Sequence, residues 1–261
     1  MNRNDFIQME KRFSNYVSGF YTDNMESNSA IQLKADHTKR VRRQIVSLCE
    51  KLSLSGRDMI LAETTALFHD IGRFQQYKDY KTFNDRISVN HARLGVKLLA
   101  VNNLLKGYTN DEKRLISKAV AYHNAAVLPE DENAKILLFM RLIRDADKLD
   151  IWKIYTDYYN SRSSGRNKTI ELGLPDDPVC SREIIRALCE KRFARVQDIK
   201  TLNDYKLLQL SWVFDLNFVP SFQAVQNYMY LEKIEAALPE SREIKEAVKH
   251  AYNYVKKNAG G

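Results

Sequence analysis

Glycine and proline are scarce in this chain, and their scarcity limits the fold class. The 261 residues include 9 Gly and 5 Pro, well below the roughly 12% that the two residues make up in average proteins. β-Sandwiches, β-barrels and low-complexity disordered chains are rich in turn residues of this kind. Alternating strand patterns are also essentially missing. The composition therefore favours an all-helical protein.

Long hydrophobic runs and cysteine pairs are missing as well. No apolar stretch approaches the roughly 18 residues that a membrane-spanning helix needs, and the opening MNRNDFIQMEK lacks the features of a signal peptide. The three cysteines, Cys49, Cys180 and Cys189, form no CxxC motif and cannot all pair with one another. We therefore expect a cytoplasmic protein with reduced thiols and no membrane partner.

The charge is moderately basic. The sequence has 41 Lys and Arg against 33 Asp and Glu, a formal net charge of +8. Such a balance can indicate an anionic partner, such as a nucleotide, a phosphate ester or nucleic acid. However, the basic residues are mixed with acidic ones along the chain, as on solvated helix faces. The charge is compatible with a phosphorylated substrate but does not establish one.

Apolar residues recur at three- and four-residue steps through nearly the whole chain, which is the period of a helix. Gly72 fits a helix end or a sharp turn, and Thr109 or Asn110 is a candidate N-cap. The pattern predicts helices over residues 6–20, 36–52, 60–68, 91–101, 111–123, 133–159, 181–195, 202–216, 221–237 and 241–258.

The second half of the chain contains one segment rich in turn residues. Residues 161–178, SRSSGRNKTIELGLPDDP, are predicted to form a loop. This loop separates a helical core over residues 1–160 from a C-terminal helical region over residues 161–261. We expect the C-terminal region to pack on the core as part of one domain, and the sequence gives no argument about oligomeric state.

Four of the five histidines lie in the first half of the chain. His37, His69, His91 and His123 each lie near the end of an expected helix, and Asp70 follows His69 directly. Taken alone, a histidine on a helix is usually hydrogen-bonded or exposed. Four of them on different helices could instead project into one shared cleft of a helical bundle, together with carboxylates.

A later segment, RDADKLD, supplies two further carboxylates, Asp145 and Asp147. Imidazole and carboxylate ligands suit divalent cations such as Mn, Fe, Co, Ni or Zn. No cysteine belongs to the set, which argues against a structural zinc site. The residues alone therefore predict a helical protein with a His/Asp cluster suited to a divalent cation.

In order, the chain reads DHTKRV, LFHDIGRF, SVNHARLG, AYHN and RDADKLD. This series resembles the HD-domain metal-dependent phosphohydrolase superfamily, whose signature is H…HD…D on a helical bundle. The resemblance covers about residues 30–155. It implies an all-α HD-domain bundle, here with an additional C-terminal helical region, and hydrolysis of a phosphoester.

The resemblance also implies a ligand set. The first cation would be held by His37, His69, Asp70 and Asp147. His91 and His123 match the two extra histidines of the binuclear branch of the superfamily, in which Asp70 would bridge two cations. The cofactor would be one or two divalent ions, of Mn, Fe, Co, Ni, Zn or Mg.

Two cations about 3.5–4 Å apart would lower the pKa of a water and polarise the phosphoryl oxygens. Besides Asp70, the predicted catalytic residues are Arg73, as a clamp on a phosphate oxygen, and Lys148, which follows Asp147. Asp145 could orient a ligating histidine.

The segment between Asp70 and His91 is polar and aromatic. It would cover the cleft if both flanking residues enter it, so Gln75, Gln76, Tyr80 and Asp85 could meet a substrate.

The leading prediction is hydrolysis of a small phosphorylated compound, with a nucleotide favoured as the substrate. A nuclease for single-stranded nucleic acid is a less favoured alternative, because it would need a continuous basic track. A cyclic-nucleotide phosphodiesterase is another. Arg73 stands where the cyclic di-nucleotide branch commonly has Lys, and no GYP segment follows His123, which argues against a cyclic di-nucleotide. A non-catalytic metal-binding regulatory module and a di-iron oxygenase stay open.

Overall fold

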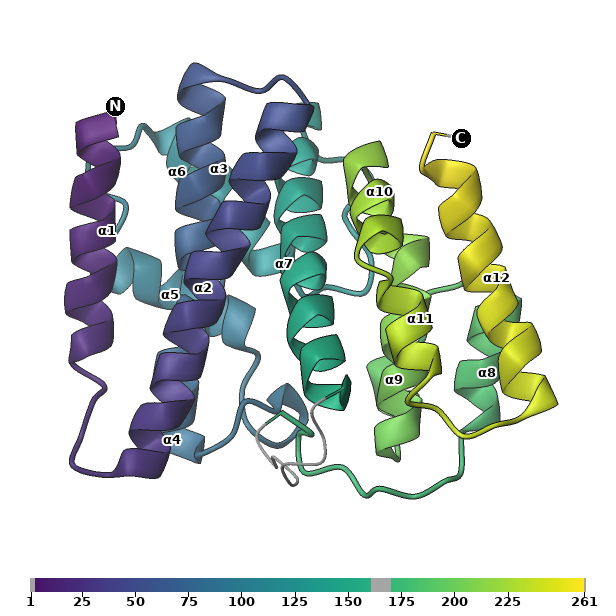
Figure 1. The fold of residues 1–261 in the computed structure, drawn as a ribbon. Helices are drawn as coiled ribbons and strands as arrows, with labels where there is room; N and C mark the ends of the chain where they lie inside the picture. Colours follow the sequence, from purple (N-terminus) through teal and green to yellow (C-terminus); the bar gives the residue numbers. More distant parts are fainter. Residues whose placement is uncertain (1–2, 161–169, 261) are drawn as a thin grey trace. The chain divides into compact units, whose positions relative to one another are not determined.

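A computed structural model describes residues 3–160 and 170–260, and all regular elements in these ranges are helices (Figure 1). The predicted all-α fold is confirmed. The chain divides into two compact units, Met1–Asp147 and Lys148–Gly261, which are described separately below. None of the described helices is both long enough and apolar enough to cross a membrane.

The first unit holds the helices of the predicted core. Within it α2 packs along α3, α4 packs against α5, and α6 packs against both α3 and α5. The elements are α1 (Arg3–Ser18), α2 (Met25–Lys51), α3 (Gly56–Phe68), α4 (Ile71–Tyr80), η1 (Asp85–Ile87), α5 (His91–Val101), α6 (Asn110–Tyr122) and the first part of α7 (Ala134–Asn160).

Side-chain caps fix the starts of two helices that carry histidines. The Asn90 side chain accepts a hydrogen bond from the Arg93 amide and begins α5. Thr109 and Glu112 form a reciprocal capping box at the start of α6, which satisfies amides that a helix start leaves unpaired. Thr109, rather than Asn110, is thus the N-cap.

An aromatic core supports the turn that carries His69 and Asp70. Phe13 from α1 lies edge-on to Phe68 at the end of α3 and to Phe74 in α4, with ring centroids 6.2 and 5.9 Å apart. Burying each ring contributes about 1.5–3 kcal/mol. The packing therefore anchors both helices that flank the turn.

Gly72, predicted at a helix end or a sharp turn, lies in the first turn of α4, directly after the turn at His69 and Asp70. Its residue type has a packing cause, because a Cβ at this position would lie 2.1 Å from the His91 carbonyl oxygen and 2.8 Å from the Gly95 amide nitrogen. Glycine thus lets α4 and α5 approach more closely than any other residue would allow. The close approach places the start of α5 beside the start of α4.

The second unit contains the remaining helices. Within it α12 packs against α8 and α10, and the buried Trp152 of α7 donates its indole N–H to the Gln209 carbonyl. The elements are the last part of α7, α8 (Arg182–Cys189), η3 (Val196–Asp198), α9 (Leu202–Ser211), η4 (Trp212–Asp215), α10 (Val219–Asn227), α11 (Tyr230–Glu235) and α12 (Arg242–Asn258).

Three predicted helices of this unit are shorter than expected. Lys191 and Met229 adopt left-handed backbone conformations, with φ of 54° at each. They lie after α8 and between α10 and α11. The apolar period continues through these positions, but a left-handed residue interrupts the helix. Residues 170–178 form turns and irregular backbone as predicted, and residues 161–169 lie outside the described ranges. The expected packing of the C-terminal region on the core stays a prediction.

Candidate metal centre

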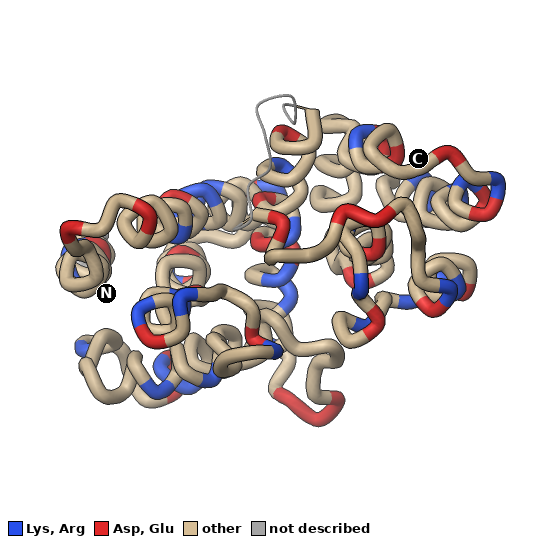
Figure 2. The backbone as a smooth tube through the Cα atoms, turned by 90° about the horizontal axis from the view of Figure 1, so that it is seen from below, with Lys and Arg blue, Asp and Glu red and all other residues tan. Residues whose placement is uncertain are grey.

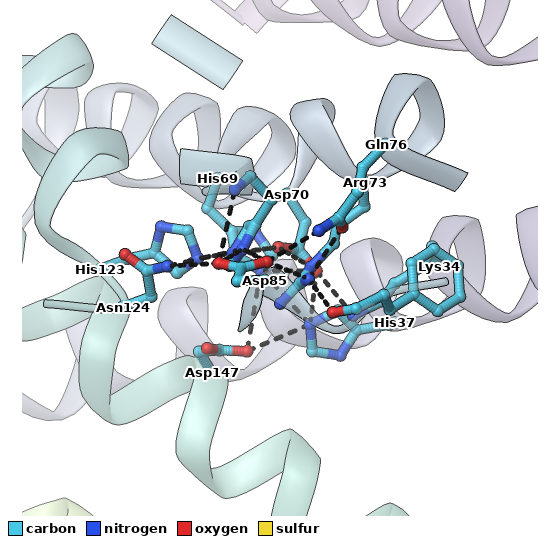
Figure 3. Close-up of polar contacts among 12 residues, drawn as sticks. Lys34, His37, His69, Asp70, Arg73, Gln76, Asp85, His123, Asn124 and Asp147 are labelled. Atoms are coloured by element: carbon cyan, nitrogen blue, oxygen red, sulfur yellow. Dashed lines mark hydrogen bonds and ion pairs between the residues drawn. The ribbon is translucent and has the colours of Figure 1, made fainter. Parts of the chain in front are cut away.

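The six predicted ligands meet at one place in the first unit. Figure 3 labels five of them, and these side chains point toward one another: His37, His69, Asp70, His123 and Asp147. All but Asp147 are buried. His37 comes from α2, His69 and Asp70 from the turn between α3 and α4, His91 from the start of α5, His123 from the end of α6, and Asp147 from α7.

The first group of ligand atoms surrounds one oxygen of Asp70. The Nε2 atom of His37 lies 3.6 Å from Asp70 Oδ2, 3.1 Å from Asp147 Oδ1 and 3.3 Å from His69 Nε2. His69 Nε2 lies 3.9 Å from Asp70 Oδ2 and 3.7 Å from Asp147 Oδ1. Two imidazoles and two carboxylates therefore converge on one point.

The second group surrounds the other oxygen of the same carboxylate. Asp70 Oδ1 lies 3.2 Å from His91 Nε2 and 3.6 Å from His123 Nε2. The two imidazole nitrogens lie 2.9 Å from each other. Asp70 thus faces the first group with Oδ2 and the second with Oδ1, which is the arrangement of a bridging ligand.

Hydrogen bonds at Nδ1 set the tautomers of three of the histidines. His69 Nδ1 donates to the Ala66 carbonyl at 2.8 Å, and His123 Nδ1 donates to the Val120 carbonyl at 2.7 Å. His91 Nδ1 donates to the Asp85 carboxylate at 2.7 Å. Because Nδ1 carries the proton, Nε2 presents a lone pair toward the cluster.

The convergence of lone pairs suits a cation. His91 and His123 each aim an unprotonated Nε2 at the other across 2.9 Å, an arrangement that is repulsive unless positive charge lies between them. Ligand bonds of about 2.0–2.1 Å place two nitrogens on one ion roughly 3 Å apart. The nitrogen–nitrogen distances in both groups match this spacing, so the residues present fit a divalent cation in each group.

The carboxylates of the cluster are ionised. Burial raises the pKa of Asp70, but the Lys34 ammonium and the surrounding imidazoles outweigh this effect and hold the pKa well below its usual range. Burial also acts to raise the pKa of Asp147, and the neighbouring imidazoles of His37 and His69 hold it well below normal. Both groups are therefore anionic at neutral pH and could act as ligands of a cation.

Burial has the opposite effect on the imidazole of His123. It lowers the pKa to about 4, against the attraction of Asp70 and with added repulsion from the neighbouring imidazoles. His123 is therefore neutral at pH 7 and available as a ligand.

Two cations of the protein lie beside Asp70. The Lys34 ammonium is 2.9 Å from Asp70 Oδ2, and Arg73 Nε is 3.5 Å from Asp70 Oδ1. Lys34 went unrecognised in the sequence, although it lies three residues before His37 on the same helix, a spacing that puts both on one face. Arg73, predicted as a clamp on a phosphate oxygen, lies in the first turn of α4.

The nitrogen Nη1 of Arg73 is committed to the protein. It donates to the Phe83 carbonyl, to Gln76 Oε1 and to Asp85 Oδ1. The phosphate-clamping role of Arg73 stays a prediction and rests on its other nitrogens. Lys148 pairs with Asp215 at 2.6 Å, so its predicted role would require the ammonium to leave that partner.

The residues expected to meet a substrate divide into two kinds. Gln76 is fully buried and its amide is used by Asp85, Ser88 and Val89, so it supports the site instead. Gln75 donates to the surface residue Asp79, and Tyr80 is exposed.

Asp145 is fully buried in α7, and its predicted orienting role stays a prediction.

The buried Arg144, for which the sequence pattern predicted no role, holds the end of α6. Arg144 donates to the carbonyls of Tyr122, His123 and Ala125, which are carbonyls that a helix end leaves unpaired. It lies one turn before Asp147 on α7. One short stretch of α7 thus supplies a ligand and also fixes the turn that carries His123.

Comparison with known families agrees with this geometry. Residues 35–152 match the family model described as the HD domain, a range that includes all six ligand candidates. No curated protein and no solved structure gives a significant match. The chain therefore carries an HD domain over residues 35–152, with the H…HD…D residues gathered at one point of a helical unit.

Proposed function

We propose that this protein is a metal-dependent phosphohydrolase that cleaves a phosphoester of a small phosphorylated compound, with nucleotides as the favoured substrates. The observation that carries the proposal is the Asp70 carboxylate, whose two oxygens face separate groups of ligands. Such a centre suits two divalent cations, which together lower the pKa of a water and polarise phosphoryl oxygens.

The charge of the ligand set favours an anionic substrate. Asp70 and Asp147 provide two negative charges, while the imidazoles are neutral ligands. Two divalent cations bring four positive charges, so the loaded centre keeps an excess of about two. A phosphate dianion would neutralise that excess. Lys34 and Arg73 lie beside the same carboxylate and add further positive charge, which Asp85 balances in part.

The protein side chains have separable roles in this proposal. Asp70 and Asp147 hold charge at the centre, and the backbone carbonyls of Ala66 and Val120 keep the His69 and His123 lone pairs aimed at it. Preorganised ligands of this kind avoid reorganisation during the reaction. Arg73 and Lys148 remain candidates for contact with the substrate phosphate.

Metal analysis of the purified protein, followed by phosphate release from a panel of nucleotides and sugar phosphates, tests the proposal. We expect bound divalent metal and release of phosphate from at least one compound. Asp70→Asn should abolish release and lower the metal content, because it removes the shared ligand. Asp36→Asn, at a surface acid of the same unit that pairs with Lys39, is the matched control and should behave as wild type.

The alternatives predict different outcomes on the same samples. Lysine and arginine alternate with acidic residues along the helices (Figure 2), as the sequence analysis expected for solvated faces. Cleavage of single-stranded nucleic acid but no small compound would favour a nuclease, and oxygen consumption by an iron-loaded sample would favour an oxygenase. Metal binding without any turnover would favour a regulatory module and would overturn the proposal.

A further inference from the structure

We propose that Asp85 is a positioning residue that holds His91 in the ligating tautomer and thereby determines whether the second group of ligands binds a cation. This inference rests on the two-cation centre of the proposed function and adds to it the residue that controls one half of the centre.

The contact between Asp85 and His91 is made through the ring. Asp85 Oδ2 and Oδ1 lie 2.7 and 2.9 Å from His91 Nδ1, whereas the contact from Asp85 Oδ2 to the His91 backbone nitrogen is 3.4 Å. Asp85 therefore acts on the imidazole more strongly than as a cap of α5. With the proton held at Nδ1, the lone pair at Nε2 faces Asp70 and His123.

A network of donors fixes the Asp85 carboxylate in turn. Arg73 Nη1 and Gln76 Nε2 reach Asp85 Oδ1 at 2.9 and 2.8 Å, and Asn124 Nδ2 reaches Asp85 Oδ2 at 3.2 Å. Arg73 and Gln76 are also hydrogen-bonded to each other. Donors from α4 and from the residue after His123 thus hold one acceptor, which can accept about four hydrogen bonds.

The three histidines with defined Nδ1 contacts differ in the group that accepts the hydrogen bond from Nδ1. His69 and His123 donate to neutral backbone carbonyls of their own helices, which any helical sequence would provide. His91 begins its helix and has no preceding turn to supply a carbonyl. Asp85 fills that place with an anionic acceptor, and a carboxylate behind a ligating imidazole raises its basicity.

The contacts of Asp85 associate this residue with the second ligand group alone. Its contacts run to His91, to the Arg73–Gln76 pair and to Asn124, while the described contacts of the first group run to Asp70, Asp147 and Lys34. A change at Asp85 should therefore weaken one site and spare the other. This selectivity is what separates a positioning role from a general structural role.

Asp85→Asn tests the inference, because it keeps the size of the side chain and removes its charge. Asp79→Asn is the matched control, since Asp79 is an exposed acid of the same segment whose carboxylate accepts hydrogen bonds from the Gln75 side-chain amide. Nitrogen NMR of the metal-free proteins reports the His91 tautomer. Titration with Mn²⁺, followed by electron paramagnetic resonance, distinguishes isolated ions from coupled pairs.

In wild type and Asp79→Asn we expect His91 to carry its proton at Nδ1 and two Mn²⁺ ions to give a coupled signal. In Asp85→Asn we expect part of the His91 population to shift its proton to Nε2. The affinity for the second Mn²⁺ should fall about 10- to 100-fold, with the first affinity within twofold of wild type.

Two results would overturn different claims. If Asp85→Asn bound both ions as tightly as wild type with an unchanged tautomer, or lost both ions equally, the positioning role would be wrong while the proposed function stood. If wild type itself bound no Mn²⁺ at the His/Asp cluster, the proposed function would fail.

Discussion

Lys34 and a cation bound in the first group would compete for the same carboxylate oxygen. The ammonium lies 2.9 Å from Asp70 Oδ2, and the Asp70 side chain is only 4% exposed. Lys34→Met would leave the buried Asp70 carboxylate with only the more distant Arg73 as a charged partner, so we expect the metal-free protein to lose about 1–3 kcal/mol of unfolding free energy. We also expect Mn²⁺ to bind about tenfold more tightly, a change of roughly 1.4 kcal/mol.

Chemical denaturation without metal and calorimetric titration with Mn²⁺ measure the two effects. Lys39→Met is the control, because Lys39 lies on the same helix but pairs with Asp36 at the surface. Weaker Mn²⁺ binding by Lys34→Met would show that Lys34 assists the cation instead of competing with it.

His123 makes the metal-free protein sensitive to mild acid. Burial lowers its pKa to about 4, whereas an unfolded histidine has a pKa near 6.5. As the pH falls through this interval, the unfolded chain takes up a proton that the folded protein does not, so stability decreases. The full loss is on the order of 3 kcal/mol, and this contribution is intact above about pH 6.5.

Replacing His123 with Gln removes this titration. We expect the unfolding free energy of metal-free His123→Gln, measured by urea denaturation, to fall less between pH 6.5 and 4 than that of wild type. His250→Gln changes the histidine that belongs to neither ligand group and should keep the wild-type pH dependence. An identical pH dependence in His123→Gln and wild type would contradict the assignment.

At the scale of elements, the close packing of α4 on α5 places His91 against Asp70. A methyl group on Gly72 would collide with the His91 carbonyl oxygen at 2.1 Å, and backbone cannot yield as a flexible side chain can. We expect Gly72→Ala to cost about 1–3 kcal/mol and to weaken the second cation site more than the first.

Thermal denaturation and Mn²⁺ titration would measure both consequences. Gly19→Ala provides the comparison, since a Cβ there would meet only the Tyr16 carbonyl oxygen at 3.5 Å. If Gly72→Ala bound two ions as wild type does, the helix contact would not determine the position of His91.

The sequence predicts most helices of the first unit, but α4 (Ile71–Tyr80) and the first part of α2 were not predicted. Thr109 with Glu112 is a local capping signal, and the period of α5 is unbroken from His91 to Val101. The residues alone indicate a His/Asp cluster, but the ligand set was assigned through the HD resemblance, because each residue has an ordinary explanation when taken alone. Their convergence depends on long-range packing that no local pattern contains.

The supporting residues could not be assigned in the same way. Asp85 was predicted to face a substrate, and only the fold shows that its carboxylate accepts the hydrogen bond from His91 Nδ1. Gly72 looked like a helix end, because local sequence does not reveal how closely α5 approaches. In the second unit, Met229 interrupts a helix within a continuous apolar period by adopting a φ of 54°.

At the scale of the whole molecule, the proposed centre links five separate segments of one unit, so cations should stabilise the fold. Binding to the folded state alone contributes about 2.7 kcal/mol when the free cation is at 100 times its dissociation constant. We expect chelation to lower the melting temperature by several degrees and Mn²⁺ to restore it. Asp70→Asn should show no such dependence, and an equal response from that variant would mean that the cation acts elsewhere.

The most direct test is a crystal structure of the Mn²⁺-loaded protein with anomalous diffraction data. The account predicts two manganese peaks about 3.5–4 Å apart, one beside Asp70 Oδ2 with His37, His69 and Asp147, and the other beside Asp70 Oδ1 with His91 and His123. Peaks only at other places, or an Asp70 carboxylate in contact with no ion, would contradict it.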